Sequence, residues 1–139
     1  MAKTQNDPVK RDEYVLRRIP NNPDWYLASL PIPIQWVAFA PNAKDTDGLS
    51  IFRELFVTPE RVAHAGRNPA GYYVARLAVS KLLELGLSVV PDPRADEPPG
   101  HALIPEMSHA AAKNSKTKSR EVQLQLAKLA SSAIVYTPG

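Results

Sequence analysis

The chain has 139 residues, of which 44% are hydrophobic and 22% are charged, proportions typical of one globular domain. It contains no cysteine, so disulfide frameworks, cysteine-ligated zinc or iron–sulfur sites and thiol catalysis are excluded. No apolar run has the length of a membrane span, and the polar first residues lack the apolar core of a secretion signal. We therefore expect a cytoplasmic protein that does not contact a membrane.

The first half of the chain is expected to form a tail, three strands and one helix. Residues 1–12 are polar and are predicted to be a flexible tail. β-prone residues predict strands at 14–19 and 34–39, each stopped by a proline, and a shorter strand at 49–52. A helix is predicted to begin at Thr58, because threonine caps helix starts and the proline after it fits the first helical position.

Residues 72–85 leave two alternatives open. Aromatic and β-branched residues favour a strand at 72–79, followed by a helix at 80–85 that ends at Gly86. One continuous helix over 73–85 is the alternative. Further short strands are expected at 87–90, 101–104 and 133–137.

The clearest helix is predicted at 120–130, where Val122 and Leu126 begin an apolar stripe at helical spacing. The residues before it, 108–119, are polar, alanine-rich and basic, and are predicted to be a surface linker. Together the elements predict one α+β domain over 13–139, with a small mixed or antiparallel sheet and two or three short helices. The 14 prolines, about twice the average usage, predict stiff and ordered loops.

Basic residues gather in the second half of the chain. Residues 61–139 carry 10 basic and 6 acidic side chains, whereas residues 1–60 carry 7 and 8. Four basic residues lie before and at the start of the predicted C-terminal helix without an intervening acid, at Lys113, Lys116, Lys118 and Arg120. One interpretation is contact with nucleic-acid phosphates. A solvated linker is favoured instead, because no aromatic residue is present for base stacking and cations are disfavoured at a helix N-terminus.

A second candidate surface lies at the end of the first predicted strand. Arg17 and Arg18 point to opposite faces of that strand, so one of them is available to a cleft while the other is structural. Trp25 and Tyr26 lie in the proline-framed loop that follows, and aromatic residues beside an arginine are typical of binding surfaces. The alternative is that the aromatic residues cover the core and an arginine pairs with a nearby acid.

The sequence contains no recognisable catalytic or metal-binding motif. His64, His101 and His109 are widely spaced and match no ligand pattern, so each is interpreted as structural, although His101 begins a strand and could face a cleft. No serine lies in a G-x-S-x-G elbow, and residues 66–71 lack the ending of a phosphate loop. Four acids lie in or near the proline-rich stretch 91–105, at Asp92, Asp96, Glu97 and Glu106. Nothing in the sequence fixes the distance between any two of them.

Five segments resemble, in the same order, a group of small uncharacterised bacterial proteins. They are Leu16–Pro20, Asp47–Ser50, Leu85–Pro93, Gly100–Glu106 and Leu126–Ser131. The resemblance extends over most of the chain and implies a single domain, but it implies no activity.

A second resemblance is to RES-type toxins, which have an ADP-ribosyltransferase-like fold and consume NAD. It rests on an early strand with Arg17 or Arg18, on the turn at 66–71 and on the tyrosine-containing segment 72–75. The chain departs from this family because it lacks the complete G-R-F-N pattern and an evident catalytic acid, for which Glu84 is the candidate.

The missing catalytic constellation favours a non-enzymatic binding or accessory module that acts through protein contacts in a bacterial cell. Its expected partner is another protein or a second copy of the chain, and no cofactor or metal is expected. Two alternatives stay open. One is a nucleic-acid-binding accessory protein that uses residues 113–120, and the other is an NAD-consuming ADP-ribosyltransferase-like enzyme or toxin.

Overall fold

The computed structural model describes residues 4–138, whose strands form one antiparallel sheet of six in the order β4-β5-β2-β1-β3-β6. The strands are β1 (Tyr14–Pro20), β2 (Leu49–Arg53), β3 (Tyr72–Ala78), β4 (Val90–Pro91), β5 (His101–Ile104) and β6 (Ile134–Tyr136). The expected α+β fold with a small antiparallel sheet is therefore confirmed.

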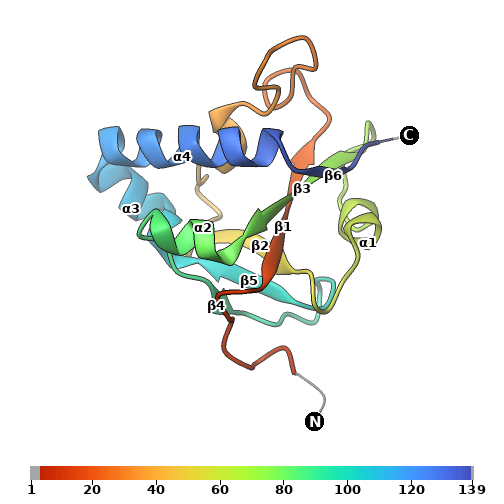
Figure 1. Cartoon of the computed structure of the whole chain (residues 1–139), viewed down its shortest axis with the longest axis vertical. Helices are drawn as coiled ribbons and strands as arrows, with labels where there is room; N and C mark the ends of the chain where they lie inside the picture. The colour runs from red at the N-terminus through yellow and green to blue at the C-terminus, as the bar shows by residue number, and fades with distance from the viewer. Residues whose placement is uncertain (1–3, 139) are drawn as a thin grey trace.

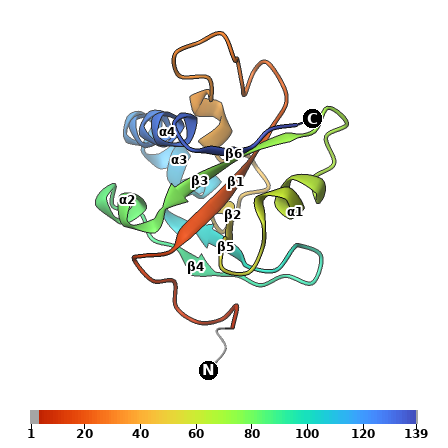
Figure 2. The same cartoon turned by 45° about the vertical axis from the view of Figure 1, so that its right-hand side comes forward.

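The helices cover the two sides of the sheet unequally. They are α1 (Pro59–His64), α2 (Val79–Glu84), α3 (His109–Asn114) and α4 (Lys116–Ser131), with the 3-10 turns η1 (Trp36–Phe39) and η2 (Pro105–Met107). Figures 1 and 2 show α2, α3 and α4 on one side of the sheet and α1 on the other. Among residues 4–138, no helix combines the length and the apolar character needed to cross a membrane.

A hydrophobic cluster on each side of the sheet holds these layers together. Because side chains alternate along a strand, Val15 and Ile19 of β1 belong to the cluster under α4, whereas Leu16 belongs to the one under α1. The α4 side holds the larger cluster, which includes Leu126 of α4. The α1 side has a smaller one, covered by a helix of 6 residues that contributes Val62.

The two central strands β1 and β2 separate early. β1 pairs with β3 along its whole length but with β2 at two positions only. Beyond them the Arg17 side chain reaches across, and its Nη1 donates to the carbonyl of Ser50 at 2.8 Å. Its Nε and Nη2 donate to the carbonyl of Ala38 at 3.2 and 2.8 Å. A side chain thus takes the place of strand-to-strand hydrogen bonds at this point.

The strand predicted at 34–39 is wrong. Ile34 forms only an isolated bridge with Tyr26, and the residues from Trp36 onwards form η1. The backbone N–H of Ile34 donates to the hydroxyl of Ser131 at 3.0 Å instead of to a neighbouring strand. The prolines before and after this segment remove donors that a longer strand would need.

Two other segments also differ from the prediction. The strand expected at 87–90 is reduced to the two residues of β4. The linker expected at 108–119 is helical, since it contains α3 and the first turn of α4. Ser108 caps α3 by accepting a hydrogen bond from the N–H of Ala111, and alanine-rich sequence has high helix propensity that outweighs the basic charges.

The first part of the expected tail, residues 1–3, lies outside the described residues, and residues 4–12 are held against the domain. Arg53, 1% exposed, pairs with the Glu13 carboxylate at 2.9 Å and donates to the carbonyls of Gln5 and Asp7. The side chain of Gln5 accepts from the N–H of Gly100 at 2.7 Å. A buried cation that needs several acceptors thus organises this segment.

The remaining elements agree with the prediction. Residues 72–85 form a strand followed by a helix, β3 and α2, and not one continuous helix. The hydroxyl of Thr58 accepts from the N–H of Arg61 at 3.2 Å and caps α1, as expected.

Candidate functional site

A serine, a histidine and an aspartate are joined by hydrogen bonds on the α1 side of the sheet. The Nε2 atom of His101 lies 3.1 Å from the hydroxyl of Ser50. Its Nδ1 atom lies 2.9 Å from the backbone carbonyl of Asp92 and 3.1 Å from the carboxylate of the same residue. Because both groups near Nδ1 are acceptors, Nδ1 carries the proton and Nε2 accepts from the serine hydroxyl. In this tautomer His101 is arranged as a general base for Ser50 or for a molecule bound beside it.

Strand register brings these three residues together. β2 and β5 pair with Phe52 opposite His101, so Ser50, two residues before Phe52, is a diagonal neighbour of His101 on the same face. Asp92 follows β4, the strand beside β5, and its N–H donates to the carbonyl of His101 at 2.9 Å. The serine is partly exposed, whereas the His101 side chain is 1% exposed and packs edge-on against the Phe52 ring.

Gly100 allows His101 to take this position. Its φ of +88° is unfavourable for other residues, and an added Cβ would lie 2.9 Å from the carbonyl oxygen of Arg53. Its carbonyl accepts from the N–H of Arg53 at 2.8 Å. A close backbone approach therefore fixes the start of β5 and with it the imidazole.

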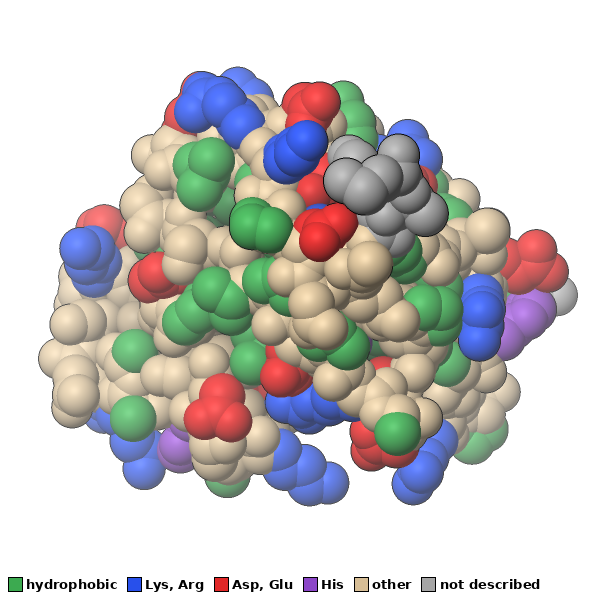
Figure 3. Space-filling model, turned by 90° about the horizontal axis from the view of Figure 1, so that it is seen from below, with side chains coloured by type: hydrophobic (Ala, Val, Ile, Leu, Met, Phe, Trp, Pro, Cys, Tyr) green, Lys and Arg blue, Asp and Glu red, His purple; other side chains and the backbone are tan. Residues whose placement is uncertain are grey.

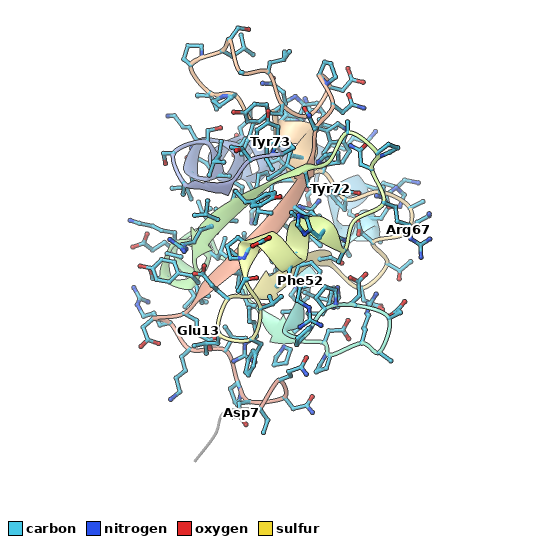
Figure 4. All side chains as sticks on the ribbon, turned by 90° about the vertical axis from the view of Figure 1, so that its right-hand side faces the viewer. Asp7, Glu13, Phe52, Arg67, Tyr72 and Tyr73 are labelled. Atoms are coloured by element: carbon cyan, nitrogen blue, oxygen red, sulfur yellow. The ribbon has the colours of Figure 1, made fainter. Side chains whose placement is uncertain are left out.

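Arg18 lies on the same face, two residues after Leu16 in β1. Its guanidinium lies 5.4 Å from the ring centroids of both Phe52 and Tyr72, and Nη1 donates to the carbonyl of Val62 at 3.1 Å. Figure 4 looks onto this side of the sheet, with Phe52 beside α1 and Tyr72 at the start of β3. Among residues 4–138, no carboxylate forms an ion pair with Arg18. Neutral groups therefore hold the guanidinium, and Nη1 alone forms a side-chain hydrogen bond with another residue of the described part of the chain.

Arg17 has a different role, although it is the next residue. Burial lowers the pKa of its guanidinium to about 10, with Asp45 opposing and Arg18 adding to that shift. Its hydrogen bonds go to backbone carbonyls, including that of Ser50. Arg17 therefore positions the chain beside Ser50 and does not offer its charge to solvent.

Trp25 and Tyr26 are not brought beside Arg18. Both are partly buried against the larger cluster on the α4 side, and the Tyr26 ring stacks on Tyr73 at 3.7 Å between centroids. Burial raises the pKa of the Tyr26 hydroxyl, followed in importance by the neighbouring Tyr73. These rings cover the core, as one of the two interpretations expects, but among the described residues neither Arg17 nor Arg18 forms the ion pair with an acid that this interpretation also expects.

The four basic residues of the 113–120 segment have different surroundings. The Arg120 guanidinium lies 3.5 Å from the centroid of the Trp36 ring, and Lys118 borders a pocket beside α4. Lys113 and Lys116 are exposed in α3 and at the start of α4. Figure 3 shows one face of the molecule from below, where basic and acidic side chains are interspersed.

The sequence alone indicates a structural role for His101 and does not connect it with Ser50 or Asp92. The hydrogen bond from His101 to Ser50 joins residues 51 positions apart, and the contact with Asp92 joins residues 9 apart. No sequence motif has those spacings. Finding the site would have required a prediction that β2 pairs with β5 in this register. Glu84, the acid suggested by the second resemblance, forms an exposed pair with Lys81 on α2, on the other side of the sheet.

Within residues 4–138, no group of three or more histidine, aspartate or glutamate side chains is arranged to hold a metal ion. Comparisons with protein-family models, with curated proteins and with solved structures found no significant match.

Proposed function

We propose that the chain is an NAD-consuming, ADP-ribosyltransferase-like enzyme whose site contains Arg18, Ser50, His101 and Asp92. The observation that carries the proposal is the position of an unpaired Arg18, fixed between two aromatic rings, on the same face as the Ser50–His101–Asp92 series. The resemblance to RES-type toxins supports it, because Arg18 on the first strand contacts Tyr72 in the segment after the turn.

The chemistry of NAD fits these groups. Its diphosphate matches a guanidinium with free N–H donors, and its rings match an aromatic surface. The bond between the ribose C1′ and the nicotinamide nitrogen breaks, and neutral nicotinamide leaves with the electron pair. Water or an acceptor hydroxyl attacks C1′ and passes its proton through the Ser50 hydroxyl to Nε2 of His101. Asp92 stabilises the imidazolium that forms, so the products are nicotinamide and ADP-ribose or an ADP-ribosylated acceptor.

The test is release of nicotinamide from NAD by the purified protein. We expect turnover that Arg18→Ala lowers at least about a hundredfold, because a charge-assisted contact to phosphate is lost. Arg11→Ala is the matched control, since Arg11 is an exposed arginine outside both the proposed site and the turn at 66–71. Expression of the wild-type chain is expected to arrest growth, and Arg18→Ala to relieve it. A folded wild-type protein that releases no nicotinamide and is harmless on expression would overturn the proposal.

The protein-contact function expected from the sequence stays a second proposal, on another surface. The loop before η1 exposes Leu27, Leu30 and Ile32 by 38–41%, and Figures 1 and 2 show it extending beyond the sheet. Exposed apolar residues that cluster in this way are typical of interfaces. If the partner is a second copy of the chain, sedimentation analysis shows a dimer that Leu30→Asp dissociates. A monomer at all concentrations contradicts this form of the proposal.

A further inference from the structure

A pocket of about 230 Å³ lies on the side of the sheet opposite the proposed catalytic site. One wall is α4, which contributes Val122 and Gln123, and the others include Leu87 and Met107. Leu87 and Met107 belong to the larger hydrophobic cluster, so the floor of the pocket is apolar. Its volume is below that of drug-sized sites and suits a molecule of about one ring.

Gln123 is the unusual residue of this pocket. Gln123 is 5% exposed, yet its side-chain amide forms no hydrogen bond with any other residue among 4–138. The other buried polar residues, Glu13, Arg53 and His101, are all hydrogen-bonded. In the described part of the chain, every polar side-chain atom that is fully buried has a hydrogen-bond partner. The unpaired Gln123 amide is therefore not fully buried, and it is accessible from the pocket that it lines. Two N–H donors and one acceptor are thus offered to a ligand.

The charges around the pocket favour an uncharged ligand. Glu106 is the acid in its lining, and its two oxygens accept from the N–H and hydroxyl of Ser88 at 2.8 and 2.6 Å. Lys118 is the base in the lining, and it is exposed. One acid and one base leave the wall without net charge, so a buried ionic ligand would lack a counter-charge.

We propose that this pocket binds a small, uncharged ring compound with a planar amide edge, a carboxamide or a lactam. An amide of this kind both donates to and accepts from the Gln123 side chain, while its ring packs against Leu87, Met107 and Val122. The site is separate from the one proposed for NAD turnover and does not depend on it.

The test is an NMR titration of the full chain with benzamide, and with benzoate and toluene as matched probes. Benzamide is expected to shift the backbone signals of Leu87, Met107 and Val122, and to bind about tenfold more tightly than either other probe. Gln123→Leu is expected to remove this preference and to improve toluene binding. Gln125→Leu, on the exposed side of the same helix, is expected to change neither.

The outcomes separate the two sites. If the pocket beside α4 is the binding site, Arg18→Ala leaves the benzamide titration unchanged. This holds whether or not the substitution lowers nicotinamide release from NAD. The proposal is overturned if benzamide does not shift these signals, if toluene binds as tightly as benzamide, or if Gln123→Leu and Gln125→Leu behave alike. Retention of the preference in a folded Gln123→Leu protein also overturns it.

Discussion

The two sides of the sheet differ in what they bury. On the α4 side, a long helix covers the larger hydrophobic cluster, and the aromatic residues Trp25 and Tyr26 extend it. On the α1 side, a helix of 6 residues covers a smaller cluster, and polar groups from three strands share the same face. Buried polar groups cost stability unless they are paired, and on the α1 face no carboxylate of residues 4–138 forms an ion pair with Arg18. We infer that the α4 side supplies most of the stability, and the chemistry that we propose lies on the α1 side.

The largest expected effect is on catalysis at the α1 side. His101→Gln is expected to lower nicotinamide release about a thousandfold, because the general base is lost, and Asp92→Asn is expected to lower it less. Asp96→Asn is the matched control, because Asp96 is an exposed acid of the same loop. Circular dichroism and thermal unfolding check that each variant folds. Equal turnover by the His101→Gln and Asp96→Asn proteins would show that the hydrogen-bonded series has a structural role only.

The sequence predicts the layers of this molecule better than it predicts the site. The strand at 14–19 and the cap at Thr58 follow from local preferences, which the structure preserves. The site depends on the register of β2 against β5, which brings Ser50 to His101 across 51 positions of the chain. Register is a property of the whole sheet, so no local pattern reveals it.

The strand predicted at 34–39 does not form, for a related reason. Its alternating apolar residues are typical of a strand, but Pro33 and Pro41 limit pairing, and its backbone bonds to Ser131 of α4 instead. Residues 108–119 form α3 and the start of α4 because their alanine content and the cap at Ser108 favour a helix despite the basic charges. In both places a tertiary contact or a cap decided between alternatives that the local sequence leaves nearly equal.

The next effect compares the two clusters directly. Leu49 lies in the larger cluster and Leu16 in the smaller one, and both are 0% exposed. Leu49→Ala is expected to reduce the free energy of unfolding by about 4 kcal/mol, and Leu16→Ala by about 3 kcal/mol, because the short α1 can relax into the cavity. Urea unfolding measures both values. A larger loss for Leu16→Ala would reverse the assignment of stability to the α4 side.

A smaller effect concerns the pH dependence of stability. The folded-state pKa of Arg17 is lowered to about 10 by burial, so the unfolded chain binds more protons above that pH. The contribution of Arg17 to the free energy of unfolding therefore rises with pH, by roughly 1 kcal/mol between about pH 9 and about pH 11. The measurement is the free energy of unfolding of the wild type minus that of Arg17→Met, taken at both pH values. Tyrosine titration affects both proteins alike and cancels in this difference. A difference that does not change with pH contradicts it.

The smallest effect is expected at the basic segment on the α4 side. Phosphate binding by four cations would give a log–log salt dependence of affinity with a slope of about −3.6, since each contact contributes about −0.9. Arg120 lies over the Trp36 ring and Lys118 borders the pocket, so we expect Lys113 and Lys116 to make the main phosphate contacts. We therefore expect a slope no steeper than about −2 for a DNA oligonucleotide, and heparin retention that changes little when the three lysines become glutamine. A steep slope that collapses in the triple-glutamine variant would instead support nucleic-acid binding and show that the α4 side also carries a function.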